Sequence, residues 1–189
     1  MGDAAKRKNR EAVWRKSLSA EERVVVDVAL RLSSILPLYG ACYQSSFFLF
    51  YHLQKVHGLT GKAVVGFVND GTDTTYCSHA WFTFNNAITD LAIARPLRPD
   101  VQHPGPLTIH GFEFKPGWRW SYHLCASLED QKFFEQFRNH PVYGIQIQEE
   151  ENIREKMSMI SEDNDLIREY LDSADNGFTY DTLAKLVVL

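Results

Sequence analysis

The sequence is poor in cysteine and has no long apolar run. Its 189 residues include three cysteines, an odd number, and no stretch reaches the roughly 18–20 apolar residues of a membrane-spanning helix. No apolar segment follows the basic residues near the N-terminus, as a secretory signal would require. We therefore expect a cytoplasmic protein without membrane segments, whose cysteines are free thiols and not a disulfide framework.

Motifs for phosphate and for metal binding are also lacking. Residues 66–71 do not have the Lys-Ser/Thr ending and the helix entry of a phosphate-binding loop. Neither Cys-x-x-Cys nor His-x-x-x-His spacing occurs, so we expect no cofactor and no metal. One metal site stays open as an alternative, although its residues are not closely spaced in the sequence. It would consist of Cys77, His79, Asp90 and either His103 or His110.

Apolar side chains, by contrast, are numerous enough for one buried core. Hydrophobic residues make up 44% of the chain and aromatic residues 13%, which suits a single domain and excludes a wholly disordered chain. The net charge of −4 is uneven, because residues 1–16 carry six bases and two acids while residues 146–189 carry four bases and eleven acids. No aromatic residues alternate with the N-terminal bases, so a solvated helical end is favoured over a nucleic-acid arm.

Periodicity and turn residues predict an α+β domain. Helices are expected at residues 19–36, 42–56 and 129–138, and strands at residues 63–68, 76–84, 87–92, 107–109, 112–114 and 118–126. In the last strand aromatic residues alternate with polar ones, which favours a half-buried strand over the wall of a substrate groove. The organisation is then a basic arm or helix at 1–18, a catalytic domain at 19–147 and an acidic helical extension of that domain at 148–189.

Cys42 opens the most apolar of the predicted helices, which we expect to be central and buried. A thiol at a helix N-terminus meets the positive end of the helix dipole and unpaired backbone amides, which stabilise the nucleophilic thiolate. The same amides are placed to donate to an oxyanion that forms on an attacked carbonyl. Gly40 allows a sharp turn before the helix, and Ala41 leaves the approach to the sulfur open.

His79 and Asp90 fall on two strands that Asn85 and Asn86 join. If these asparagines form a two-residue turn, opposing residues have numbers that sum to 171, as 85 and 86 do. Side chains alternate along a strand, so His79, Trp81 and Asp90 then share one face, with Asp90 diagonal to His79. A carboxylate in that place holds the imidazole in one tautomer and stabilises its protonated form. A turn of odd length would separate the two side chains.

Three short segments carry a resemblance to a known family. They read Gly-Ala-Cys-Tyr-Gln-Ser at residues 40–45, Ser-His-Ala-Trp-Phe at 78–82 and Ile-Thr-Asp-Leu-Ala at 88–92. Together they resemble the core of the transglutaminase-like superfamily, a branch of the papain-like cysteine enzymes with a Cys, His, Asp triad in that chain order. The resemblance covers about residues 37–95. Residues 141–145 also look like a late Tyr-Gly-Ile strand of short members.

This resemblance implies a papain-like core in which a nucleophile helix packs on a small antiparallel sheet. Cys42 would be the nucleophile, His79 the general base and then acid, and Asp90 the orienting carboxylate. The implied activity is that of a cysteine hydrolase acting on an amide bond of a protein or peptide, as a peptidase, amidase or glutamine deamidase, through a thioester. Acyl transfer to an amine and a catalytically inactive binding domain are the alternatives.

The remaining expectations concern the surroundings of that triad. Neither nucleic acid nor a membrane is an expected partner, and Cys77 and Cys125 are not expected to act as nucleophiles. The residues expected to line the site are Tyr43, Gln44, Cys77 and Trp81.

Overall fold

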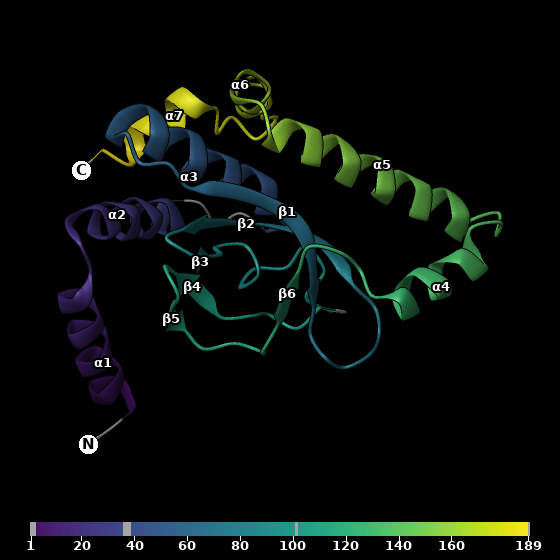
Figure 1. The fold of residues 1–189 in the computed structure, drawn as a ribbon, viewed down its shortest axis with the longest axis horizontal. Helices are drawn as coiled ribbons and strands as arrows, with labels where there is room; N and C mark the ends of the chain where they lie inside the picture. The colour runs from purple at the N-terminus through teal and green to yellow at the C-terminus, as the bar shows by residue number, and fades with distance from the viewer. Residues whose placement is uncertain (1–2, 36–38, 101, 189) are drawn as a thin grey trace.

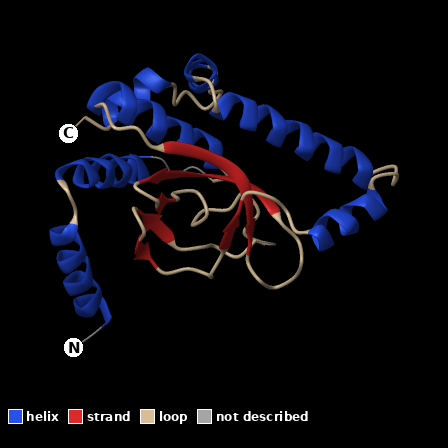
Figure 2. Ribbon diagram, in the orientation of Figure 1, coloured by secondary structure: helices blue, strands red, loops and turns tan. Residues whose placement is uncertain are grey.

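The computed structural model describes residues 3–35, 39–100 and 102–188. These residues form an α+β fold, as predicted, with helices gathered beside two small antiparallel sheets (Figures 1 and 2). The elements in chain order are α1 Asp3–Ser17, α2 Ala20–Ile35, α3 Cys42–His57, β1 Lys62–Asn69, β2 Cys77–Phe84, β3 Ala87–Thr89, β4 Leu107–Ile109, β5 Phe112–Lys115, β6 Ser121–His123, α4 Leu128–Phe137, α5 Tyr143–Ser161, α6 Asn164–Asp172 and α7 Tyr180–Leu186.

The larger sheet has the strand order β3-β2-β1-β6, and α3 packs against its two central strands. Helices α2 and α6 contact α3, and α7 contacts α2 and α6. The β4–β5 pair joins the β3 edge through a bridge between Asp90 and Thr108. The side chains of Phe47, Phe48 and Leu53 on α3 are fully buried, so the predicted central helix does lie in the core.

Local signals account for the ends of the first core helices. Ser19 Oγ accepts the Glu22 backbone N–H at 3.1 Å, and Glu22 Oε2 accepts the Ser19 N–H at 2.9 Å. This reciprocal pair is a capping box, which satisfies two amides that a helix start leaves free. Helix α3 ends at Gly58, whose φ of 68° suits the left-handed residue that commonly follows a helix.

The hairpin of β2 and β3 has the predicted register. Phe82 pairs with Thr89, and Asn85 and Asn86 both have positive φ angles, of 48° and 62°. These are the angles of a two-residue turn whose twist matches that of the strands. The second strand is shorter than predicted and ends at Thr89, so Asp90 stands at the point where the chain leaves the sheet.

The C-terminal part belongs to the same core, and its helix α5 corrects one expectation. Residues 141–145 contain no strand, because α5 begins at Tyr143 and continues the helical periodicity of the tail. A Cβ at Gly144 would lie 2.2 Å from the Arg138 carbonyl oxygen, so this glycine permits the tight approach of α4 to α5. The predicted division between residues 147 and 148 falls inside α5. The strand predicted at residues 118–126 is also shorter, at Ser121–His123.

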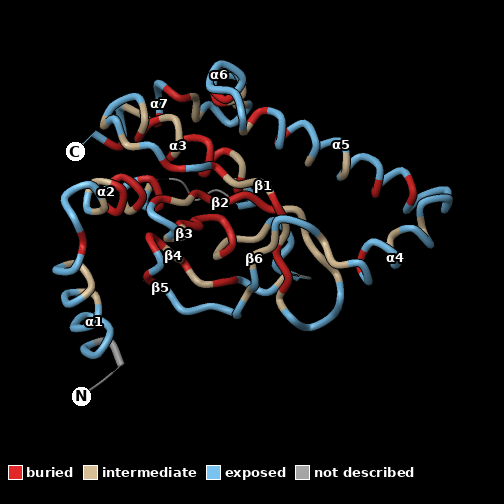
Figure 3. Tube along the Cα trace, in the orientation of Figure 1, coloured by how far each residue is buried: buried red, intermediate tan, exposed pale blue. Residues whose placement is uncertain are grey.

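Helix α1 extends away from the rest of the fold and is largely exposed (Figure 3). Its contact with the core is aromatic, since Trp14 stacks on Phe112 with ring centroids 4.6 Å apart. Arg10 lies over the Phe112 ring and Arg15 over the Phe114 ring. Among the described residues, no helix is both long and apolar enough to cross a membrane.

Candidate active site

His79 and Asp90 form a buried pair at the start of β2 and the end of β3. His79 Nε2 lies 2.7 Å from Asp90 Oδ2, and the two residues are 8% and 2% exposed. Burial lowers the pKa of His79, but the charge and hydrogen bond of Asp90, with smaller contributions from Cys42, raise it to about 10. The imidazole is therefore held as an imidazolium near neutral pH.

The Asp90 carboxylate accepts four hydrogen bonds. Its Oδ1 accepts the backbone N–H groups of Ala92 and Ile93, each at 3.0 Å. Its Oδ2 accepts from His79 and from the Tyr122 hydroxyl, which lies 2.9 Å away. Burial raises the pKa of Asp90, yet the charge of His79 and these hydrogen bonds outweigh it and lower the pKa overall. A fully bonded carboxylate of this kind is fixed in one orientation.

Tyr122 is the residue of this group that the sequence did not single out. It lies on β6 and is separated from Asp90 by 32 positions. Strand β1 lies between β6 and β2 in the sheet, so the phenol reaches Asp90 past β1 and contacts the Trp81 ring edge-on. An alternating aromatic pattern predicts the strand, but nothing in it indicates a distant carboxylate.

Cys42 stands at the first position of α3 and is 8% exposed. Its side chain lines the same cavity as His79 and is one of the smaller causes that raise the pKa of His79. Because Asp90 holds Nε2, Nδ1 is the ring nitrogen available to the sulfur. Gly40 has a φ of 67° and its Cα lies against Leu97, so a side chain there would be both strained and crowded.

The first turn of α3 is open to an incoming group. Ala41 is the N-cap residue, and no side-chain cap is made to this turn within the described residues. Backbone N–H groups at such a turn have no partner in the helix and point along its axis. They are donors for a negatively charged oxygen beside Cys42.

Cys42 and His79 open into a cavity of about 490 Å³. Tyr43 and Cys77 line it, as expected, and the Tyr43 hydroxyl shares a 2.8 Å hydrogen bond with Ser78. Burial raises the pKa of the Cys77 thiol, while Gln102 Nε2 donates to its sulfur at 3.8 Å. The other wall comes from α4 and α5, through Phe134, Glu150 and Ile153.

The two other expected lining residues lie elsewhere. Both polar atoms of the Gln44 amide bond to the C-terminal segment, since Nε2 donates to the Phe178 carbonyl at 2.8 Å and Oε1 accepts from Asn176 at 3.1 Å. Gln44 therefore ties α3 to the segment before α7. Trp81 is buried against Gly66 and beside Tyr122, and it does not line this cavity.

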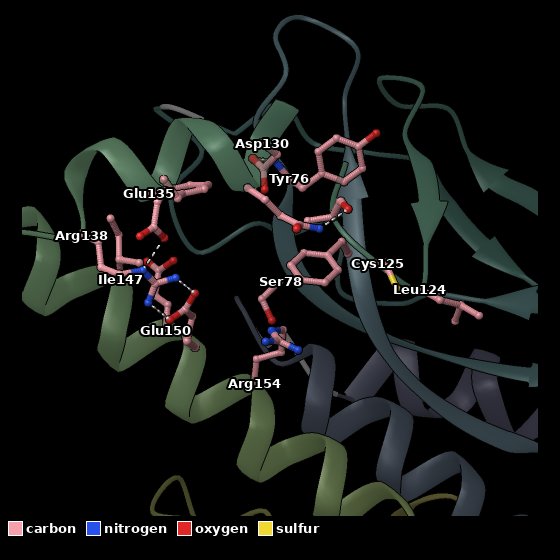
Figure 4. Close-up of a pocket in the computed structure, with 15 residues that line it drawn as sticks. Tyr76, Ser78, Leu124, Cys125, Asp130, Glu135, Arg138, Ile147, Glu150 and Arg154 are labelled. Atoms are coloured by element: carbon pink, nitrogen blue, oxygen red, sulfur yellow. Dashed lines mark hydrogen bonds and ion pairs between the residues drawn. The ribbon is translucent and has the colours of Figure 1, made fainter. Parts of the chain in front are cut away.

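A second cavity of about 430 Å³ adjoins the first. It lies between α4 and α5 on one side and, on the other, the start of β2 at Ser78 with Tyr76 just before this strand (Figure 4). Four residues line both cavities, namely Tyr76, Ser78, Phe134 and Glu150. The two cavities therefore share a wall, and we refer to the pair as the groove.

The alternative metal set is dispersed. His103 stacks on Trp118, and His110 lies 3.3 Å from Glu22 at the far side of the hairpin. Within the described ranges, no cluster of three or more His, Cys, Asp or Glu side chains has the geometry to hold a metal ion.

Comparisons with protein-family models, with curated proteins and with solved structures found no match. The chemistry that this site can perform is therefore argued from its geometry.

Proposed function

We propose that this chain is a cysteine-dependent hydrolase that cleaves an amide bond through a thioester, on a papain-like core of the transglutaminase-like type. The observation that carries the proposal is the buried His79–Asp90 pair, whose imidazole faces Cys42 in a cavity open to a substrate. An aspartate-held imidazole next to a thiol at a helix start is the arrangement that activates a sulfur nucleophile.

The first half of the reaction uses the imidazolium. The Cys42 sulfur attacks the carbonyl carbon of the amide and forms a C–S bond, while backbone amides of the first α3 turn hold the oxyanion. His79 then donates its proton to the leaving nitrogen as the C–N bond breaks. Asp90 stabilises the imidazolium before transfer and keeps the ring in place.

The second half releases the Cys42 sulfur as a thiolate. Neutral His79 takes a proton from a water molecule, whose oxygen attacks the thioester carbonyl. The C–S bond breaks, the acid product leaves, and the proton on His79 restores the imidazolium–thiolate pair. An amine in place of the water would give acyl transfer through the same steps, so hydrolysis and transfer differ in the acceptor and not in the triad.

The three cysteines allow a sharp test, because exposure and nucleophilicity predict opposite orders of reaction with an alkylating reagent. Cys125 is exposed, Cys77 intermediate and Cys42 buried. Iodoacetamide added in limited amount near neutral pH should nevertheless label Cys42 first, as read by peptide mass spectrometry. Labelling in the order of exposure, with Cys125 first, would overturn the proposal.

His79→Ala and Asp90→Asn serve as the mechanistic variants. Each should slow labelling of Cys42 and leave the rate at Cys125 unchanged, since only Cys42 faces the imidazole. Folding of each variant is checked by circular dichroism. A folded His79→Ala protein that labels Cys42 at the wild-type rate would show that the imidazole does not activate the sulfur.

A further inference from the structure

Glu150 is an acidic side chain at the junction of the two cavities. It lies on α5 and lines both the cavity of Cys42 and His79 and the neighbouring one. In Figure 4 its side chain lies on the same side of α5 as Ile147 and Arg154, toward the strand that carries Ser78. A substrate that extends from Cys42 toward the second cavity therefore meets the Glu150 carboxylate.

The Glu150 carboxylate is unpaired, unlike its neighbour. Glu151 makes two hydrogen bonds to Arg138, at 2.8 and 2.9 Å. Across the residues that the structure describes, no hydrogen bond or ion pair reaches Glu150, which is exposed at the surface, although partial desolvation raises its pKa. Burial is the main cause of the raised pKa values of Tyr43 and Cys77, and the charge of Glu150 contributes to both.

Charge along the groove favours a cation over an anion. The second cavity is lined by four carboxylates and two guanidinium groups, a net of −2. Of those two guanidiniums, Arg138 is already bonded to Glu135 and Glu151. The other, Arg154, lies over the Phe67 ring with its centre 5.2 Å from the ring centroid, which stabilises the cation in place. Among the four carboxylates of this lining, Glu150 is the one that no cation or backbone amide of the described residues bonds.

The surroundings of Glu150 suit an alkyl chain that ends in a charge. Phe134 and Ile153 line the same cavity beside it. Apolar side chains there cover the methylenes of a flexible amine, while the carboxylate takes its ammonium group. A guanidinium or ammonium could also lie against the Phe134 ring.

We propose that Glu150 is a specificity-determining residue that binds an alkylammonium group, so that substrates with a lysine-like amine reach Cys42 in preference to neutral or anionic ones. This inference rests on the proposed function of Cys42. The amine has two chemical sources, a basic side chain on the molecule that carries the scissile amide or a free amine that accepts the acyl group.

The first experiment measures charge selectivity at Cys42 without a known substrate. Three iodoacetamides with the same alkyl spacer and an ammonium, hydroxyl or carboxylate end alkylate the full chain, and the rate at each cysteine is measured by mass spectrometry. Each rate is divided by that for a small neutral thiol. The ammonium probe should label Cys42 at least about threefold faster than the hydroxyl probe, the ratio that a partly exposed ion pair supplies, and added salt should reduce this ratio.

Two matched variants locate the effect. Glu150→Gln should abolish the preference for the ammonium probe and leave the hydroxyl probe unchanged. Glu149→Gln removes the same charge from a neighbouring position that is exposed, as Glu150 is, but lines neither cavity, and it should keep the preference. Equal loss in both variants, or a preference for the carboxylate probe, would overturn the inference.

The second experiment separates the two sources of the amine. Turnover of a neutral nitrophenyl ester is followed with and without an added alkylamine, which attacks the thioester, forms a C–N bond and releases the Cys42 thiolate. If the acceptor amine binds Glu150, the amine accelerates turnover in the wild type and much less in Glu150→Gln. If the amine accelerates turnover equally in both proteins while the preference for the ammonium probe is intact, the ammonium group that Glu150 binds belongs to the acyl donor.

The outcomes keep this inference apart from the proposed function. Slow labelling of Cys42 by all three probes means that the proposed function fails. Fast labelling by all three without dependence on charge means that Cys42 is a nucleophile and that Glu150 does not select its substrate.

Discussion

Replacing Tyr122 with phenylalanine removes one of the four hydrogen bonds to the Asp90 carboxylate and little else. The Tyr122 hydroxyl lies 2.9 Å from Asp90 Oδ2, and Asp90 is 2% exposed. A hydrogen bond to a charged group contributes about 1.5–3 kcal/mol to stability. We therefore expect the free energy of unfolding to fall by about 1.5–3 kcal/mol.

The measurement is urea unfolding followed by circular dichroism, with the thermal midpoint as a second readout. For a domain of this size about 1 kcal/mol corresponds to about 2–4 °C, so the midpoint should fall by roughly 3–12 °C. Tyr143→Phe is the matched control, because Tyr143 is exposed, and it should change stability by less than about 0.5 kcal/mol.

Tyr122→Phe should also change the pKa values of Asp90 and His79, an effect that a loss of packing alone does not produce. With one donor fewer, the Asp90 carboxylate has a higher pKa. It also interacts more strongly with the His79 imidazolium, because fewer other donors share its charge. NMR titration of the His79 ring should then show a changed pKa, which the control Tyr143→Phe does not produce. A variant as stable as Tyr143→Phe, with the His79 titration unchanged, would refute the role of Tyr122 as a positioning residue.

Two further perturbations follow from the same contacts. The pKa of His79 is raised to about 10 from a usual value of 6.5, so its contribution to stability is fully present below about pH 6.5 and is lost as the pH rises toward 10. Unfolding free energies between these pH values should therefore fall more steeply in the wild type than in His79→Gln, and equal slopes would contradict the assignment. Gly144→Ala would normally stabilise a helix by about 1 kcal/mol. Here the new Cβ meets the Arg138 carbonyl oxygen, so we expect destabilisation, measured by urea unfolding, and a gain in stability would show that α4 and α5 are not held in this tight turn.

Much of the site could be predicted because its decisive signals are local. The positive φ angles of Asn85 and Asn86 depend on those two residues, and the turn length then determines which side chains of β2 and β3 oppose each other. Side chains alternate between the two faces of a strand, so the residue numbers alone place His79 and Asp90 on the same face of the hairpin. The start of α3 at Cys42 was predictable for the same reason, since Gly40 marks the turn before it.

The groove around that pair depended on contacts between distant segments. Gln44 was expected in the site because it follows Cys42, but its partners lie 132 and 134 positions along the chain. A helix places successive side chains on different sides, so closeness in sequence to a nucleophile says little about direction. The strand expected at residues 141–145 came from a resemblance of five residues alone and was wrong, since α5 begins at Tyr143. A segment this short fits either structure until its packing is known.

The sequence by itself therefore determined the α+β class, the core helix that begins at Cys42 and the hairpin register that brings His79 beside Asp90. These depend on turn residues and periodicity, which act over a few positions. Only the tertiary structure decided that Tyr122 holds Asp90, that Gln44 turns away and that Glu150 on α5 borders the cavity. Those positions result from packing between segments far apart in the chain, where no local pattern records the partner.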